Sequence, residues 1–327
     1  MCDAHGQRGP GGFGGKGGFL SGAGPLGERP GGGWERGRAG GLRASIGIVM
    51  GAMLGRRRTA PLRRFDAQVT PVLSESGDSR MSISPLFVHS WGSGPEVVLV
   101  HGVVLGGREC WRAQRPLTER WTLVAPDRPG HGKSGPARQD FETESVLVAD
   151  QLLDRPVHLV GHSYGAIVAM HAAARRPENV RSLVVVEPPA TAVAKGDPEI
   201  DELGARLRAL TLSDEPAETV LPRLFKLIGV SQELPSPLPP TLVKGARQLM
   251  GGRPADEAEP PLERLRESSF PILVVTGAHS RPFEVIGDVI ADRTGAERVT
   301  CPGAGHQVPE TGAPFNTLLA DFFQKAS

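Results

Sequence analysis

Short apolar runs alternate along the chain with longer segments in which apolar residues recur at helical spacing. The runs lie at residues 96–100, 121–125, 157–160, 182–186, 271–276 and 297–300. The helical segments lie at residues 109–120, 142–154, 164–176, 282–293 and 314–324. A short apolar run bounded by turn residues is typical of a buried strand, and its alternation with helices is typical of a parallel sheet. We therefore expect an α/β fold with a mostly parallel central sheet and helices on both faces.

Residues 82–89 form one further β-prone run, separated from the run at 96–100 by a Gly-Ser-Gly-Pro sequence at 92–95. A Gly/Pro cluster of this length between two β-prone runs is typical of a tight turn. We expect the two strands to pair as an antiparallel hairpin.

The alternation breaks at residues 190–268. Helical patterns there cover about 198–210, 216–229 and 240–250, separated by Pro-rich turns. An insertion at the carboxyl edge of a parallel sheet lies above the site that the strand ends create. We expect an inserted helical cap that shapes a substrate pocket, within one domain spanning residues 81–327.

Residues 1–80 differ from the rest in composition and charge. Gly supplies 17 of the first 41 residues, and 12 basic against 6 acidic residues give this part a charge of +6. Such a segment buries too little apolar surface to offset the entropy lost on ordering. We expect a disordered extension, or a misassigned start with Met81 as the true first residue. A nucleic-acid-binding tail is the alternative, and the lack of regularly interleaved aromatic residues disfavours it.

Several observations bear on location and metal content. The apolar run Ile46–Leu54 is much shorter than the roughly 20 residues needed to span a bilayer, and basic residues follow it, unlike in a secretory signal. Cys2, Cys110 and Cys301 are too few and too scattered for a disulfide framework or a metal site. No pair of histidines has metal-ligand spacing with a third ligand. We expect a cytoplasmic protein with no membrane anchor, no bound metal and no nucleic-acid partner.

Residues 161–165 read Gly-His-Ser-Tyr-Gly and follow directly on the apolar run at 157–160. A strand that turns straight into a helix at Ser163 holds that residue in a strained backbone conformation. Only small residues two positions before and two after then avoid a clash. The N-terminus of the following helix stabilises negative charge near the hydroxyl. The pattern predicts a nucleophile elbow.

Other motifs accompany the elbow in a fixed order. His101-Gly102 follows an apolar run, where a glycine lets backbone amides turn toward a cavity. The turn at 126–134 is dense in Pro, Gly and Asp, and we assign its Asp127 and His131 to loop shape. His306 ends a Pro-Gly-Ala-Gly-His sequence after the last predicted strand. In this order the motifs, which cover nearly all of residues 85–325, resemble those of the α/β-hydrolase superfamily.

The resemblance implies an α/β-hydrolase fold of the serine-esterase type. It implies that Ser163 attacks a substrate carbonyl and that His306 removes the serine proton and later delivers it to the leaving group. Backbone amides of Val103 and Tyr164 would form the oxyanion hole. This chemistry requires no cofactor.

The acid of the triad departs from the family pattern. An aspartate normally follows the strand at 271–276 within a few residues, but this sequence has Ser280 there, which we interpret as the N-cap of the next helix. Glu284, Asp288 and Asp292 recur at every fourth position of that helix, so we predict a solvated stripe.

Glu187 is the preferred acid, because some α/β-hydrolases place this residue at the end of the strand that follows the elbow helix. The alternative is that no carboxylate partners His306. Loss of the orienting carboxylate lowers kcat by orders of magnitude but leaves measurable catalysis, which a reactive ester would tolerate.

The sequence as a whole predicts a cofactor-independent serine hydrolase that cleaves a small carboxylic ester or related acyl compound through an acyl-enzyme. Ser163 excludes the branches with an aspartate nucleophile, the epoxide hydrolases and haloalkane dehalogenases. Two alternatives remain open. One is a carbon–carbon bond hydrolase on the same scaffold, and the other is a non-catalytic protein that uses the pocket to bind a ligand.

Overall fold

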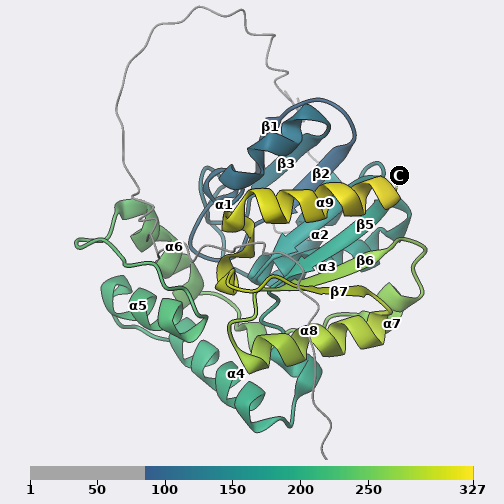
Figure 1. The fold of residues 1–327 in the computed structure, drawn as a ribbon. Coiled ribbons are helices and arrows are strands. Elements are labelled where there is room, and N and C mark those ends of the chain that lie inside the picture. Colours follow the sequence, from purple (N-terminus) through teal and green to yellow (C-terminus); the bar gives the residue numbers. More distant parts are fainter. Residues whose placement is uncertain (1–84, 327) are drawn as a thin grey trace, which may run out of the picture. The chain divides into compact units, whose positions relative to one another are not determined.

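The computed structural model describes residues 85–326, so the predictions for residues 1–80 lie outside the described residues. In this part of the chain seven strands form one sheet, ordered β1-β3-β2-β4-β5-β6-β7 (Figure 1). The strands are β1 (Phe87–Trp91), β2 (Glu96–Val100), β3 (Thr122–Asp127), β4 (Val157–His162), β5 (Val180–Val186), β6 (Ile272–Thr276) and β7 (Glu297–Thr300). Of these seven strands in residues 85–326, only β1 runs antiparallel to its neighbour. The predicted mostly parallel α/β sheet is confirmed.

The expected hairpin between β1 and β2 is wrong. The two strands run in opposite directions, but β3 lies between them and pairs with both. Both edges of β2 are occupied, since it also pairs with β4. The turn at residues 92–95 instead passes over the start of β3, where Thr122 N donates to Pro95 O at 2.9 Å.

Side chains from the two faces of the sheet enter two hydrophobic clusters. In β4, Leu159 belongs to one cluster and Val160 to the other, because successive residues of a strand point to opposite faces. The first cluster contains residues of α2 (Phe141–Leu152), α3 (Tyr164–Arg175) and α8 (Arg281–Thr294). The second contains residues of the 3-10 helix η1 (Arg112–Glu119) and of α9 (Ala313–Lys325) (Figure 1). The sheet therefore carries helices on both faces.

The segment expected to form one helix at 109–120 is instead a single turn, α1 (Gly107–Cys110), followed by η1. Pro116 lies inside η1 and lacks the N–H that a regular α-helix needs at that position. Short 3-10 helices η2 (Pro177–Asn179) and η5 (Gly305–Thr311) precede β5 and α9 respectively.

Between β5 and β6, within residues 187–271, the only regular elements are helices. The chain forms η3 (Thr191–Ala194), α4 (Pro198–Thr211), α5 (Ala217–Leu227), α6 (Pro240–Met250), η4 (Ala255–Glu257) and α7 (Leu262–Arg266). Helices α4, α5 and α6 match the predicted ones, whereas α7 has five residues and is too short to show helical periodicity. No helix within residues 85–326 is long and apolar enough to cross a membrane.

Candidate active site

Ser163 lies at the sharp turn between β4 and α3, with φ 55° and ψ −127°. A positive φ is costly for a residue with a side chain and persists only where the surroundings impose it. The turn requires glycine at both flanking positions, 161 and 165. A Cβ at Gly161 would overlap the backbone of the first turn of α3, and one at Gly165 would overlap the carbonyl oxygens at the end of β2. The turn therefore has the geometry that the Gly-His-Ser-Tyr-Gly pattern predicts.

Ser163, His306 and Glu187 form a chain of hydrogen bonds. The His306 ring lies with Nε2 at 2.9 Å from Ser163 Oγ and Nδ1 at 3.0 Å from Glu187 Oε2. The three residues follow β4, β7 and β5, so parallel strand ends bring them together from distant parts of the sequence. The exposed fractions are 6% for Ser163, 2% for His306 and 0% for Glu187. The structure thus places the predicted serine, histidine and glutamate within hydrogen-bonding reach of one another.

Glu187 is fixed from both ends. It has φ 50°, its N–H donates to Val275 O at 2.9 Å, and its Oε1 accepts from Gly277 N at 2.6 Å. Burial raises the pKa of this carboxyl, and the charge of the neighbouring His279 and the Gly277 N–H oppose the rise. Burial also lowers the pKa of His306. A neutral His306 that donates from Nδ1 to Glu187 has Nε2 free to accept the serine proton.

The loop after β2 passes directly against the serine. A Cβ at Gly102 would lie 2.9 Å from Ser163 Cβ, so only glycine allows this approach. Val104 adopts φ 77°, and helix α6 packs on its backbone so closely that a Cβ at Gly245 would overlap the Val104 carbonyl. On the other side of the serine, Tyr164 is the first residue of α3, and the first N–H groups of a helix have no intrahelical partner.

A buried ion pair that no sequence pattern reveals supports this loop. Arg128 Nε lies 2.6 Å from Glu144 Oε2, and both side chains are 1% exposed. The same guanidinium donates from Nη1 to Gly102 O at 2.8 Å, and the Arg128 N–H donates to His101 Nε2 at 2.9 Å. Arg128 therefore ties the turn after β3 to the loop beside Ser163.

Asp127, the last residue of β3, and His131, in the turn that follows, shape this loop, as predicted. Asp127 accepts hydrogen bonds from Gly107 N at 2.8 Å and Lys133 N at 2.9 Å. The His131 ring has Nδ1 3.1 Å from Pro129 O. These contacts hold the shape of the loop.

The prediction of a solvated acidic stripe on α8 is wrong for Glu284. Its Oε1 accepts from Ala278 N at 3.1 Å, and its Oε2 accepts from Thr276 Oγ1 at 2.8 Å and Arg298 Nη2 at 2.7 Å. Strand β7 supplies Arg298 beside the helix, which helical spacing alone does not reveal. Ser280 occupies the N-cap position of α8 as expected, although its side chain makes no capping hydrogen bond.

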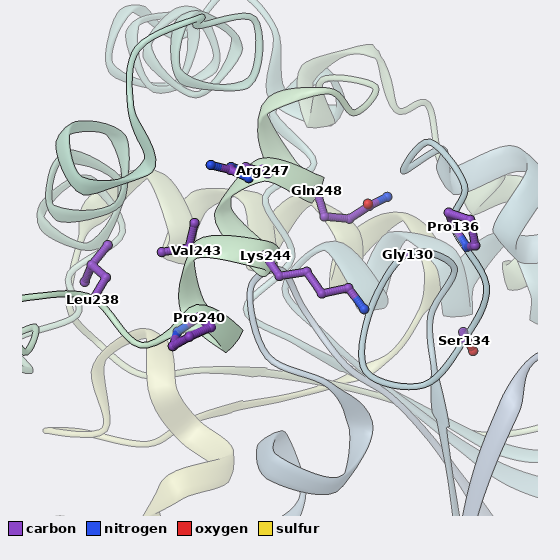
Figure 2. Close-up of a pocket in the computed structure, with 9 residues that line it drawn as sticks. All are labelled: Gly130, Ser134, Pro136, Leu238, Pro240, Val243, Lys244, Arg247 and Gln248. Carbon is purple, nitrogen blue, oxygen red and sulfur yellow. The ribbon is translucent and has the colours of Figure 1, made fainter.

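A small cavity of about 50 Å³ adjoins Ser163. It is lined by Gly102, Val103, Val104, Leu105, Cys110, His162, Ser163, Phe225, Ile228, Val230, His306, Gln307, Pro309 and Glu310. The helical segment between β5 and β6 contributes three apolar residues to this lining. A larger cavity, of about 610 Å³, lies between the 130–136 loop and α6, and Ser163, His306 and Glu187 are not among its lining residues (Figure 2).

Comparison with known proteins agrees with this geometry. Residues 97–316 match the profile of the Alpha/beta hydrolase family. A pimeloyl-[acyl-carrier protein] methyl ester esterase of Methylococcus capsulatus is 33% identical over 223 residues, which cover 63% of this chain and 85% of that protein. Lipase LipV of Mycobacterium tuberculosis is 37% identical over 162 residues, 48% of this chain and 59% of the lipase. The N-acyl homoserine lactonase AidH complexed with N-butanoyl homoserine has a similar fold, with a TM-score of 0.56 at 22% identity, covering 73% of this chain and 93% of that one. The chain therefore belongs to the alpha/beta hydrolase family.

Proposed function

We propose that this protein is a cofactor-independent serine hydrolase that cleaves a small carboxylic ester through an acyl-enzyme. The observation that carries the proposal is the continuous chain from Ser163 Oγ through the His306 ring to Glu187, with distances of 2.9 and 3.0 Å. An ester as the substrate class is supported by two of the relatives, which are named as a methyl ester esterase and a lipase.

The reaction begins when Ser163 Oγ attacks the carbonyl carbon and passes its proton to His306 Nε2. Glu187 stabilises the imidazolium through Nδ1, and the N–H groups of Val103 and Tyr164 bind the oxyanion. Collapse of the tetrahedral intermediate expels the alcohol, which takes the proton from Nε2. Water then attacks the acyl-serine by the same route, releasing the acid and restoring Ser163.

The cavity beside Ser163 limits the size of the substrate. At about 50 Å³ it has room for only a few water molecules, each of which needs about 10–15 Å³ of accessible space. Val103, Val104 and Phe225 make much of its wall apolar. We infer a preference for short, uncharged acyl groups.

A series of p-nitrophenyl esters of increasing chain length tests this proposal. We expect turnover of the acetate and butyrate, falling rates with longer chains, and no activity in Ser163→Ala. A fluorophosphonate probe applied to the folded protein should label Ser163. Labelling without turnover of any ester would favour a carbon–carbon bond hydrolase, and absence of labelling would favour a non-catalytic ligand-binding protein.

A further inference from the structure

A second histidine lies beside Glu187, on the loop after β6. His279 Nδ1 is 3.5 Å from Glu187 Oε2, the oxygen that also meets His306 Nδ1 at 3.0 Å. The His279 side chain is 9% exposed. Both of its ring nitrogens are buried and have no hydrogen-bond partner among residues 85–326. Unpartnered buried polar atoms are costly, so a ligand that satisfied one of them would be stabilised at this place.

The three side chains have the spacing of metal ligands. One ligand atom from each of Glu187, His279 and His306 lies within 4.8 Å of the other two. Tetrahedral zinc holds nitrogen and oxygen ligands at about 2.0–2.2 Å, which separates neighbouring ligand atoms by about 3.4 Å. The distances from Glu187 Oε2 to Nδ1 of His306 and to Nδ1 of His279, 3.0 and 3.5 Å, lie on either side of that value.

The chemistry of the donors selects the kind of metal. Two imidazoles and one carboxylate are a set that Zn²⁺ and its neighbours in the first transition row accept, whereas Mg²⁺ and Ca²⁺ prefer oxygen ligands. The spacing of these three residues in the sequence does not reveal the site, because they follow three different strands, β5, β6 and β7.

We propose that Glu187, His279 and His306 form a Zn²⁺-class metal site whose occupation switches off the hydrolase. Metal binding depends only on the three side chains, while the consequence for activity rests on the proposed function. A neutral imidazole carries one proton. Coordination through Nδ1 of His306 leaves that proton on Nε2, which then donates to Ser163 Oγ instead of accepting the serine proton. The same event replaces the hydrogen bond between Glu187 and the ring with bonds from both groups to the metal.

Binding is tested without any reference to catalysis. The full chain carrying Ser163→Ala, stripped with chelator and desalted, is titrated with Zn²⁺ by calorimetry and with Co²⁺ by visible absorption. We expect one site, weakened at least about tenfold by His279→Gln, by analogy with the loss of supporting residues at metal sites. His171→Gln is the matched control, because His171 is a histidine of α3 that stacks on Phe141 of α2 and also has a buried ring nitrogen without a hydrogen-bond partner among residues 85–326. Circular dichroism establishes that each variant is folded, and Mg²⁺ should not bind.

Equal Zn²⁺ affinity in the His279→Gln and His171→Gln proteins would overturn the site, as would no binding to the parent protein. Should His279→Gln fail to fold, His279→Asn takes its place.

Activity is tested with Ser163 restored. Zn²⁺ should block hydrolysis of p-nitrophenyl acetate, EDTA should restore it, and His279→Gln should require at least about tenfold more Zn²⁺. Where no ester is turned over, the same dependence is measured as fluorophosphonate labelling of Ser163. Binding without loss of turnover or labelling would overturn the switch and leave the metal site. Failure of all hydrolysis and labelling would instead overturn the proposed function, while the calorimetric result stands.

Discussion

Replacement of Glu187 by Gln removes the negative charge beside His306 and preserves the shape of the side chain. The amide oxygen can keep the hydrogen bond from Gly277 N, now at 2.6 Å, which turns the amide nitrogen toward His306 Nδ1. An amide nitrogen only donates, so the ring must accept at Nδ1 and carry its proton on Nε2. That proton faces Ser163 Oγ, which lies 2.9 Å from Nε2, and the ring can no longer act as the base of the proposed mechanism.

The magnitude follows from this change of tautomer. Replacing the triad carboxylate by an amide with unchanged geometry lowers kcat about 10⁴-fold in serine proteases, which corresponds to about 5.5 kcal/mol of transition-state stabilisation. Stability should not fall with it. Burial raises the pKa of Glu187, so the folded protein disfavours the charge that the substitution removes. We expect an unchanged or higher melting temperature.

The assay compares kcat/KM for p-nitrophenyl acetate in Glu187→Gln, in Ser163→Ala as the floor, and in Glu284→Gln as the matched control. Glu284 is a partly buried carboxylate that hydrogen-bonds Ala278 N and Arg298, so its amide variant should keep near-wild-type activity. A Glu187→Gln enzyme within about tenfold of wild type would refute the reasoning, because removal of an effective triad acid costs far more. It would show that His306 needs no carboxylate partner.

Three further predictions concern stability, each read from urea or thermal unfolding. Gly165→Ala forces a Cβ into the backbone at the end of β2 and should lower the free energy of unfolding by at least about 1–3 kcal/mol. Gly251→Ala is the control and should lower it far less, because its Cβ would meet only Arg247 O, at 3.8 Å, among the described residues. Equal unfolding midpoints for the two variants would contradict the packing argument. Arg128→Met leaves the buried carboxylate of Glu144 without its partner and should lower the free energy of unfolding by about 3–5 kcal/mol. Adding Glu144→Leu should recover part of this loss. An Arg128→Met protein as stable as wild type would show that the ion pair is dispensable. Burial lowers the pKa of His158 to about 4. Between pH about 6.5 and about 4 the unfolded chain therefore binds a proton on this histidine and the folded protein does not. Stability present above pH 6.5 should therefore fall by up to about 1.4 kcal/mol per pH unit from this group as the pH drops toward 4, and His158→Asn should flatten the slope; an unchanged slope would exclude His158 as its source.

The turn at Ser163 was predictable because its requirement is local: a glycine two positions away on either side relieves the clash. The sheet was predictable for a similar reason, since each buried strand is a continuous apolar run. The neighbour of β1 was not, because nothing within residues 87–91 specifies that β3 rather than β2 lies beside it.

Residues defined by distant contacts were the harder part of the site. Arg128 and Glu144 belong to residue types that are almost never fully buried unless paired, and only the folded chain shows the pair. Glu284 has the spacing of an exposed helical residue, and its partner Arg298 comes from the next strand. Glu187 was identified from its place at a strand end. That His279 and His306 both lie beside it was not predictable, because the two histidines belong to separate loops.

The contact between α6 and the Val104 backbone has a consequence for protein engineering. A residue with a side chain at position 245 would overlap the Val104 carbonyl, so the helix docks on the loop only through its glycine. Grafting the helical segment of a relative into this chain, to change the substrate preference that we propose, therefore requires a glycine at that one contact. A chimaera without it must push residues 103–105 away from Ser163 or lift the graft off that loop. Position 245 thus determines whether a helical segment is compatible with the loop at residues 103–105, and libraries that vary the segment should keep glycine there.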